Sequence, residues 1–356
     1  MTDRFDLSFY RGKTVLITGH TGFKGSWLSE ILLLAGAKVI GYSLAAPTNP
    51  SLFELLGLKN RMVSIVGDVR DFKHLKEIFD EYQPEIVLHL AAQPIVRTSY
   101  EEPLYTYETN VMGTANLLEC VRLSKSVRSV LNVTTDKVYF NPDLANHGFK
   151  EDEPLDGFDP YSNSKSCSEL VTHSYKRSFF DEIKLPVSTA RAGNVIGGGD
   201  FAKDRIIPDA IRAIEEGKAI EVRNPNSTRP FQHVLEPLLA YLMIAKKQYK
   251  DFSYAGYYNV GPDDCDCVTT GQLMDLFVKA YGDGVTWVTH QQNGPHEANF
   301  LKLDCTKLKE TFGWTPKTHI EEALDLVARW SKVYFTKDLA ALKEETDREI
   351  GEFFVF

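Results

Sequence analysis

The sequence predicts an α/β protein built on a doubly wound parallel sheet. Three observations indicate this: continuously apolar segments alternate with helical ones, a glycine-rich turn follows the first of them, and polar residues stand where several of them end. Continuous apolar strands are typical of parallel sheets that helices cover on both faces. Ligands of such sheets bind beyond the carboxyl ends of the strands.

The glycine-rich turn occupies residues 18–25 and reads T-G-H-T-G-F-K-G. It joins the apolar run 14–17 to a helical pattern at 26–34, so Gly19, Gly22 and Gly25 meet a helix N-terminus. Glycine lets backbone N–H groups approach phosphate oxygens, and the helix dipole favours negative charge. We interpret the turn as the pyrophosphate site of a Rossmann-like domain. An ordinary tight loop is the alternative, since the spacing is not the common G-x-G-x-x-G.

The second predicted strand, residues 37–42, bears on the choice of dinucleotide. An acidic residue about 20 positions after the glycines usually binds the ribose 2′-hydroxyl of NAD. Tyr42, Ser43 and Leu44 stand at that place, without a carboxylate and without an arginine. These residues alone leave the choice between NAD and NADP open.

The later elements continue the alternation. We expect strands at 61–69, 85–93, 129–133 and 187–191, and helices at 72–82, 104–123 and 161–180, the last capped by Asp159 and Pro160. After Gly193 we expect a loop at 197–200, a helix at 206–216 and strands at 220–222 and 257–261. We predict a cofactor-binding domain over 1–192, rejoined by the strand near 257–261, and a mainly substrate-binding domain over 193–356.

Composition excludes some classes of function. Lys and Arg number 40 against 49 Asp and Glu, a net charge of −9, which argues against a nucleic-acid surface. The five cysteines are odd in number, and Cys265-x-Cys267 is too tight for a usual zinc knuckle, so we expect free thiols and no metal. Neither a signal peptide nor a run of about 18 apolar residues is apparent, so we expect a cytoplasmic protein without membrane partners.

Three side chains form the candidate catalytic group. Tyr161 and Lys165 are four apart at the start of a helix and therefore share a face. A nearby ammonium can lower the pKa of a phenol, which is ordinarily near 10, toward the range of a useful base. Thr135 ends the preceding strand, and the three groups suit removal of an alcohol proton while hydride leaves its carbon. A surface tyrosine and a solvated lysine are the alternative.

Several motifs resemble those of the extended short-chain dehydrogenases/reductases, and among them the nucleotide-sugar 4,6-dehydratases of the CDP-glucose type. The similarity runs from about residue 13 to about residue 316. The motifs are T-G-H-T-G-F-K-G at 18–25, H-L-A-A-Q-P-I-V-R at 89–97, T-T-D-K-V-Y at 134–139, Y-S-N-S-K at 161–165, R-A-G-N-V-I-G-G-G-D at 191–200 and R-P-F-Q-H-V-L-E-P at 229–237.

The resemblance implies roles for particular residues. It places Thr135, Tyr161 and Lys165 in the catalytic set. It implies NAD contacts from Gly19, Thr21, Gly22, Phe23, Lys24, Gly25, Asp68, Val69, Leu90, Ala91, Ala92, Thr109, Tyr161 and Lys165, and nucleotide-sugar contacts from Gln93, Asn194, Arg205, Arg229, His233 and His296. It also implies a homodimer joined by a four-helix bundle of the helices at 104–123 and 161–180, whose apolar positions include Leu117, Leu118, Val121 and Leu170.

The pair that follows Thr135 favours a dehydratase. Elimination of water across C5 and C6 needs a proton donor for the leaving hydroxyl, and Asp136 can serve if its site keeps it protonated. Lys137 stands where related dehydratases carry a carboxylate base. It can take the C5 proton when neutral, or stay cationic and stabilise the enolate. A solvated lysine without a role is the third interpretation.

The resemblance therefore implies an NAD-dependent hydro-lyase that forms a 4-keto-6-deoxy sugar for deoxysugar synthesis, of the kind that supplies lipopolysaccharide. A hydride that returns to the same sugar needs no NADP pool, which favours NAD. The alternatives are a 4-epimerase or dehydratase for a dTDP-, GDP- or UDP-linked sugar, and a regulator that binds the cofactor without catalysis.

Overall fold

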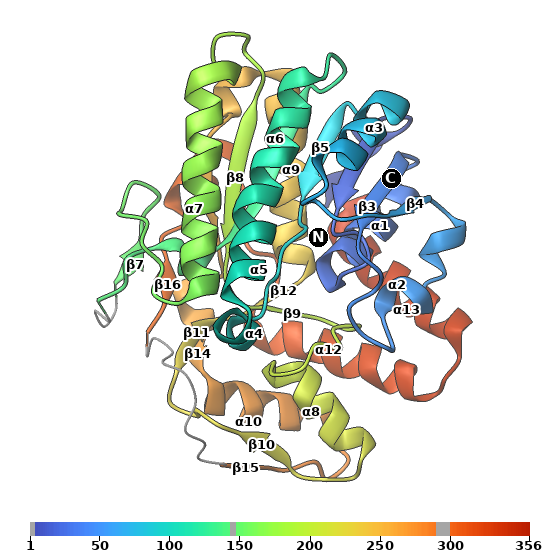
Figure 1. The fold of residues 1–356 in the computed structure, drawn as a ribbon. Coiled ribbons are helices and arrows are strands. Elements are labelled where there is room, and N and C mark those ends of the chain that lie inside the picture. Colours follow the sequence, from blue (N-terminus) through green and yellow to red (C-terminus); the bar gives the residue numbers. More distant parts are fainter. Residues whose placement is uncertain (1–3, 143–146, 290–299) are drawn as a thin grey trace.

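A parallel sheet of seven strands forms the centre of the molecule (Figure 1). In this computed structural model residues 4–142, 147–289 and 300–356 are described. The strands are β2 (Thr14–Thr18), β3 (Lys38–Ser43), β4 (Val63–Val66), β5 (Ile86–His89), β6 (Ser129–Thr135), β8 (Val187–Ala192) and β13 (Tyr257–Val260). Their order is β13-β8-β6-β5-β2-β3-β4, with parallel neighbours throughout. The predicted fold class is confirmed.

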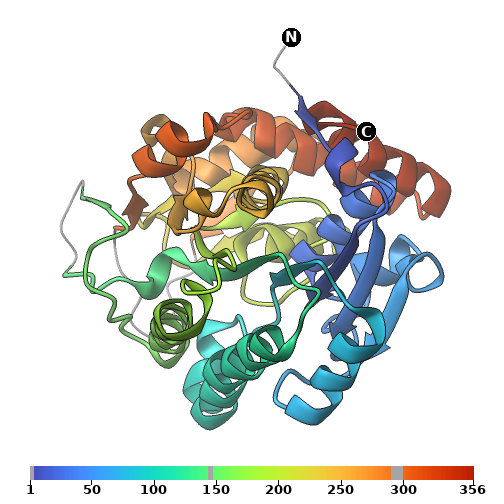
Figure 2. The same ribbon diagram turned by 90° about the horizontal axis from the view of Figure 1, so that it is seen from above.

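Helices cover both faces of the sheet (Figures 1 and 2). On one face lie α3 (Phe72–Tyr82), α6 (Gly113–Leu123) and α7 (Pro160–Tyr175), and on the other α1 (Phe23–Leu34) and α9 (Leu235–Lys250), with α13 (Leu339–Phe353) packed against them. Strand residues alternate between the two cores: Val15 and Ile17 pack toward α1 and α9, whereas Leu16 packs toward α3 and α6. The continuous apolar runs therefore reflect burial on both sides.

A smaller region lies beyond the carboxyl ends of the strands, at the bottom of Figure 1. It contains α8 (Ile206–Glu215), α10 (Thr270–Tyr281), the parallel pair β10 (Ile220–Val222) and β15 (Trp287–Thr289), and the antiparallel pair β11 (Thr228–Pro230) and β14 (Cys267–Thr269). Helix α12 (Ile320–Phe335) joins its core to that of the sheet. This region faces the edge where the sheet is expected to bind its ligands.

Short elements complete the described chain. They are α2 (Leu52–Leu55), α4 (Val96–Glu101), α5 (Pro103–Tyr107), α11 (Thr306–Phe312), β7 (Gly148–Phe149) with β16 (Lys302–Leu303), and β9 (Val195–Ile196) with β12 (Gln232–His233). Near the two ends of the chain, β1 (Phe5–Asp6) pairs in parallel with β17 (Phe354–Val355). None of the described helices combines the length and the apolar character needed to cross a bilayer.

Several predicted elements differ from the structure. The helix expected at 161–180 is α7 followed by a π-helical segment η5 (Lys176–Phe180), and the strand expected at 85–93 is only Ile86–His89. The helix expected at 104–123 consists of α5, a π-helical segment η3 (Glu108–Met112) and α6. The wider π turn accompanies burial of both Thr109 and Asn110. The strand expected at 61–69 is only Val63–Val66. At Gly67 the chain passes the ring of Tyr42 so closely that a Cβ would lie 2.3 Å from it, and pairing stops.

The expectation that Leu117, Leu118 and Val121 face a dimer partner is wrong. All three are fully buried in the core between α3, α6 and the sheet. A hydrophobic pattern alone does not separate a sheet-facing position from a partner-facing one. Instead, an outer apolar stripe on α5, α6 and α7 and the segments that adjoin them remains exposed, and it consists of Leu104, Met112, Leu123, Leu170 and Phe179.

Acid should destabilise this fold through buried histidines. Burial lowers the pKa of His89 and of His233 to about 3. In the unfolded chain a histidine has a pKa of about 6.5. Between that pH and the folded-state pKa, the unfolded state therefore binds protons that the folded state does not bind. We expect the free energy of unfolding to fall as the pH decreases from about 6.5 toward 3, measured by urea unfolding across that range. A flat profile would contradict the assignment.

Candidate active site

The glycine turn is shaped so that no side chain fits inside it. Strand β2 ends at Thr18, and α1 begins at Phe23 after Gly22. Gly19 has a φ of 78°, and a Cβ on it would lie 2.7 Å from the backbone nitrogen of Ala91. A Cβ on Gly25 would lie 2.1 Å from the carbonyl oxygen of Gly19. The turn therefore presents backbone groups and a helix N-terminus, as anion binding requires.

Gly25→Ala tests this turn. The added methyl group must push α1 away from Gly19, so we expect affinity for NAD⁺ to fall about 100-fold, which corresponds to ~2.7 kcal/mol. Isothermal titration calorimetry measures the change. Gly351→Ala is the matched control, because a Cβ there meets nothing within 4 Å. Unchanged affinity in Gly25→Ala would show that the turn does not hold the dinucleotide.

The wall beside the turn is polar and lacks a carboxylate at the end of β3. The hydroxyl of Thr21 lies 2.9 Å from that of Ser43 and donates to the carbonyl oxygen of Leu44 at 3.0 Å. The carboxylate of Asp68 is occupied by the guanidinium of Arg70, 2.7 Å away, whose hydrogen bonds hold the pKa of Asp68 below its usual value. Hydroxyl groups thus stand where an acidic residue would usually bind the ribose.

The other predicted cofactor contacts line the same edge of the sheet. Ala91 donates its backbone N–H to the hydroxyl of Thr18 at 3.2 Å, which places the segment after β5 against the glycine turn. The buried hydroxyl of Thr109 has no hydrogen-bond partner among the described residues. An unsatisfied buried hydroxyl is costly, so this group is available to a ligand. Leu90 and Ala92 flank Ala91, and Phe23 and Lys24 open α1.

The predicted catalytic set comes together at the start of α7. Asp159 caps the helix by accepting the Ser162 N–H at 2.9 Å. Lys165 donates from Nζ to the carbonyl oxygen of Val133 at 3.1 Å, and burial lowers its pKa to about 8. Thr135, at the end of β6, hydrogen-bonds Tyr161. Contrary to the expected lowering, burial raises the pKa of Tyr161 to about 12, and the Thr135 hydrogen bond only partly offsets this.

Asp136 and Lys137 form the 3₁₀ turn η4 (Asp136–Val138) directly after Thr135. The Asp136 side chain is fully buried, and its Oδ1 accepts from the Thr135 hydroxyl at 3.0 Å and from Lys137 Nζ at 3.1 Å. Its Oδ2 has no hydrogen-bond partner among the described residues and lies beside Gly193. The carboxyl group therefore has one open oxygen in a buried place.

Three of the residues predicted to bind the substrate, Asn194, Arg205 and Arg229, are described in the structure. Asn194 Oδ1 is 3.5 Å from Lys137 Nζ. Arg205 pairs with Asp200 at 2.9 Å, and its charge favours the phenolate of Tyr161. Arg229 is buried on β11 and donates to the carbonyl oxygen of Thr228 at 2.9 Å. Asp200 was not predicted, although its position in the G-G-G-D motif five residues before Arg205 could have suggested the pair.

Two residues predicted to contact the substrate, His233 and Gln93, are engaged within the fold, and their substrate roles stay predictions. The His233 side chain is fully buried between the rings of Trp27 and Phe353, with its Nε2 3.6 Å from Glu349. The amide of Gln93 is already satisfied within the described chain: it donates to Ile95 and Thr106 and accepts from the Ile95 N–H. Both residues serve the fold here. His296 lies outside the described residues.

A buried ion pair, missed by the sequence analysis, ties the catalytic helix to the sheet. Glu169 of α7 accepts hydrogen bonds from Thr134, Thr189 and His173 and pairs with Arg191 of β8 at 3.0 Å. Neither charged side chain is exposed. Although burial opposes it, Arg191 and the other donors lower the pKa of Glu169 to about 2. Glu169 is four residues after Lys165, so its position on the same helix face was a usable signal.

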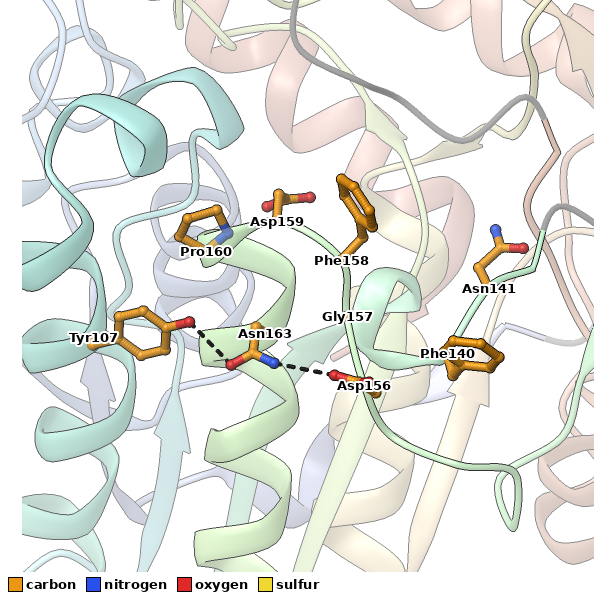
Figure 3. A pocket seen from close by; sticks show the side chains of 9 residues that line it. All are labelled: Tyr107, Phe140, Asn141, Asp156, Gly157, Phe158, Asp159, Pro160 and Asn163. Atoms are coloured by element: carbon orange, nitrogen blue, oxygen red, sulfur yellow. Dashed lines mark hydrogen bonds between the residues drawn. The ribbon is translucent and has the colours of Figure 1, made fainter.

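A cavity of about 390 Å³ opens beside the N-terminus of α7 (Figure 3). It is lined by Tyr107, Phe140, Asn141, Asp156, Gly157, Phe158, Asp159, Pro160 and Asn163. Within it the Tyr107 hydroxyl donates to Asn163 at 3.0 Å, and Asn163 donates to Asp156 at 3.3 Å. Residues two apart on a helix point in different directions, so Asn163 faces away from Tyr161. None of the catalytic candidates lines this cavity.

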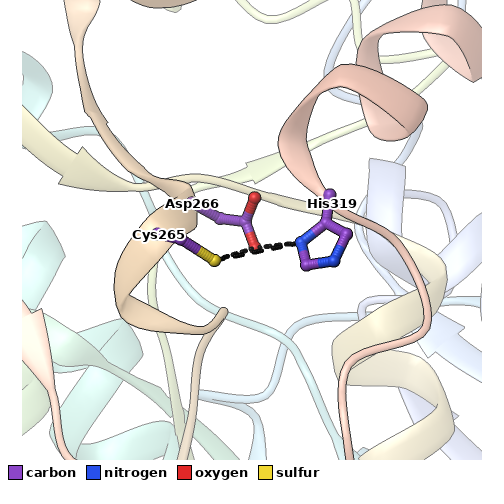
Figure 4. A group of neighbouring side chains, drawn as sticks. All are labelled: Cys265, Asp266 and His319. Atoms are coloured by element: carbon purple, nitrogen blue, oxygen red, sulfur yellow. Dashed lines mark hydrogen bonds and ion pairs between the residues drawn. The ribbon is translucent and has the colours of Figure 1, made fainter.

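Cys265, Asp266 and His319 also lie together (Figure 4). Asp266 accepts the Ile320 N–H at 2.9 Å through one oxygen and lies 3.0 Å from His319 Nδ1 through the other. Ile320 begins α12, so the carboxylate caps that helix. Helix capping accounts for this group, and we assign no ion to it.

The sheet, the glycine turn and the Thr135, Tyr161 and Lys165 set define an extended short-chain dehydrogenase/reductase. A family model described as GDP-mannose 4,6 dehydratase matches residues 16–327, and the chain belongs to that family. It is 48% identical over 335 residues to the CDP-glucose 4,6-dehydratase of Salmonella typhimurium, covering 92% of this chain and 93% of that protein. It is 27% identical over 343 residues to the dTDP-glucose 4,6-dehydratase of Haemophilus influenzae, covering 89% and 97%.

Solved structures share the fold. The UDP-glucose 4-epimerase of Thermotoga maritima with UDP-glucose aligns with a TM-score of 0.78 at 24% identity, over 91% of this chain and 99% of that one. The dTDP-glucose 4,6-dehydratase of Bacillus anthracis in complex with NAD aligns with a TM-score of 0.73 at 21% identity, over 94% and 100%. Epimerases and dehydratases thus share this architecture, and the site must separate them.

Proposed function

We propose that the protein is a CDP-glucose 4,6-dehydratase, which converts CDP-D-glucose to CDP-4-keto-6-deoxy-D-glucose and water. The observation that carries this is the η4 turn, which brings a buried carboxyl group and an amine, Asp136 and Lys137, to the site of Tyr161. Oxidation at C4 needs only the tyrosine set, whereas elimination also needs an acid and a base. The relative of that name, 48% identical to this chain, supports the substrate.

The cofactor is NAD, and the residues present fit it. The turn at Gly19, Gly22 and Gly25 offers backbone donors to the pyrophosphate, and the hydroxyl of Thr109, which has no partner within the described parts of the chain, is available to bind. The solved dehydratase with NAD supports the assignment. A bound NAD supplies the acceptor for the C4 hydride and the donor that returns it to C6. Because the hydride returns, the enzyme ends each turnover with the cofactor unchanged.

Oxidation depends on the residues at the start of α7. Tyr161 accepts the proton of the 4-hydroxyl, and Thr135 orients that hydroxyl from the end of β6. With a pKa of about 12 the phenol needs help to ionise. The ammonium of Lys165 and the positive charge of a bound nicotinamide ring both favour the phenolate. Arg205 adds a third positive charge nearby.

Elimination depends on the η4 turn. The C4 ketone acidifies C5, and neutral Lys137 takes the C5 proton; the ammonium that results then stabilises the enolate. Asp136 donates a proton to the C6 hydroxyl, which leaves as water. The open Oδ2 of Asp136 is suited to that contact because it has no partner among the described residues. Lys137 returns its proton to C5 when C6 is reduced, and the proton that Tyr161 took from O4 restores Asp136, so the net loss over one turnover is one water.

One experiment separates this function from its rivals. The protein is incubated with NAD⁺ and CDP-, dTDP-, GDP- and UDP-glucose, and the products are followed by NMR and by absorbance of the 4-keto sugar in alkali. We expect a 4-keto-6-deoxy product from CDP-glucose at the highest kcat/KM. A C4 epimer without loss of water would identify an epimerase, and the absence of turnover with every sugar would identify a regulator.

We further propose a cytoplasmic homodimer joined by α5, α6 and α7, which supplies deoxysugars for surface polysaccharides such as lipopolysaccharide. The outer apolar stripe supports the dimer, because Leu104 is 78% exposed and Leu170 51% exposed on adjacent helices. Exposed large apolar side chains on neighbouring helices favour such an interface. Absence of disulfides among the five cysteines supports a reducing compartment. Residues 1–192 with β13 would form the cofactor domain and 193–356 mainly the substrate domain.

Leu170→Glu should weaken the dimer. A charge at the centre of an apolar interface must be desolvated without a partner, so we expect the dissociation constant to rise at least about 100-fold. Light scattering should then give a dimer mass for the parent and a monomer mass for the variant at micromolar concentration. Leu339→Glu is the matched control, since Leu339 is 53% exposed at the start of α13. A monomeric parent protein would disprove the proposal.

A further inference from the structure

A buried tyrosine, Tyr139, connects the η4 turn that holds Asp136 and Lys137 to the central sheet. Tyr139 follows η4 directly and is almost fully buried. Its hydroxyl donates to Asn259 Oδ1 at 2.6 Å and accepts from Arg191 Nη1 at 2.8 Å. Its ring stacks on Phe149 with centroids 5.0 Å apart and planes at 8°. The chain end of the turn is therefore fixed to two strands, β8 and β13.

The same network reaches the catalytic helix. Arg191 also pairs with Glu169, which is one turn along α7 from Lys165. Glu169 accepts in addition from Thr134, the residue before Thr135. A second link, from the Ser166 hydroxyl to the Val138 carbonyl oxygen at 2.7 Å, joins α7 to η4 directly. The residues assigned to oxidation (Thr135, Tyr161 and Lys165) and those assigned to elimination (Asp136 and Lys137) are thus linked by one connected set of buried contacts.

We propose that Tyr139 is a positioning residue for elimination: its hydroxyl fixes the η4 turn, so that Asp136 and Lys137 meet C6 and C5 of a sugar already held by Tyr161. The inference rests on the proposed dehydratase function. Glu169 keeps its hydrogen bonds with Thr134, Thr189 and His173 when the Tyr139 hydroxyl is lost, so this loss should slow elimination more than oxidation. Displacements of about 1 Å are enough to slow a reaction about 100-fold.

Tyr139→Phe tests this, because it removes only the hydroxyl and keeps the ring. Mixed with CDP-glucose, the variant should reduce its NAD at the parent rate and then accumulate NADH absorbance, with turnover lowered about 10- to 100-fold. Tyr10→Phe is the matched control: it removes a buried hydroxyl that donates to Leu242, in another part of the core. That variant should show no accumulated NADH. Parent-like turnover in Tyr139→Phe, or an equal slowing of both half-reactions, would overturn the proposal.

A second readout needs no substrate. Lys137 is 30% exposed and paired with Asp136, so its amine can be labelled with an acylating reagent and followed by mass spectrometry. A loosened turn should make Lys137 react several-fold faster in Tyr139→Phe than in the parent or in Tyr10→Phe. An unchanged labelling rate would overturn the positioning role even if the parent proved to be an epimerase. Failure of the parent to dehydrate any sugar, together with faster labelling of Lys137 in Tyr139→Phe, would instead overturn the proposed function and leave only the anchoring of the turn standing.

Discussion

Tyr161→Phe is expected to lower kcat by about 10²- to 10⁴-fold, the loss typical of removing a positioned acid–base group. We assign the phenol as the base of the Thr135, Tyr161 and Lys165 set because Lys165 Nζ is engaged with the Val133 carbonyl oxygen, and the benzene ring of phenylalanine fills the same space. Binding of NAD⁺ and of CDP should change little, because neither depends on the proton. Steady-state assays and calorimetry measure the two quantities separately.

Tyr241→Phe provides the control for that variant. Tyr241 is fully buried, and its hydroxyl has no hydrogen-bond partner among the described residues. Loss of this hydroxyl should leave turnover within a factor of a few. If Tyr161→Phe also remains within a factor of a few of the parent, another group must be the base.

Asp136→Asn is expected to separate the half-reactions. The amide has nearly the same shape but cannot donate an acidic proton to the departing C6 hydroxyl, so elimination should slow by about 10²- to 10⁴-fold. Oxidation at C4 should survive, because it depends on Tyr161, Lys165 and Thr135. The variant should therefore accumulate NADH absorbance on mixing with CDP-glucose, and deuterium at C4 should slow its appearance.

Asp159→Asn is the control for charge and folding near the same helix, because asparagine also caps helices well. It should turn over normally. If Asp136→Asn turns over like the parent, or binds substrate without forming NADH, Asp136 is not the acid of the elimination step.

The parts of the fold predicted from the sequence are those set by local pattern. Apolar runs such as 14–17 and 129–133 identified buried parallel strands, and Asp159-Pro160 identified the start of α7, because these signals act over a few residues. The π-helical segment η3 was not predictable in this way, since it accompanies burial of side chains among elements distant in sequence.

The residues of the site also fall into two kinds: those whose position follows from the local sequence and those whose position depends on the whole fold. Asp136 and Lys137 directly follow Thr135 in the sequence, so their position beside it could be predicted. His233 belongs to a motif that resembles the family, yet Trp27 and the distant helix α13 enclose its side chain, which a motif cannot reveal. For Tyr161, the four-residue spacing to Lys165 suggested a lowered pKa. The depth of its burial, which decides the direction, depends on the whole fold.

The pair of Glu169 and Arg191 has a consequence for how this chain can vary over evolution. Removing one partner leaves a fully buried charge and costs about 3–5 kcal/mol, a large share of the stability of most domains, whereas replacing both with packed apolar residues can be nearly neutral. Single substitutions at either position are therefore selected against, and only joint changes remain open. Positions 169 and 191 should consequently be inherited as one unit, so that among descendants of this sequence the two residues change together or not at all.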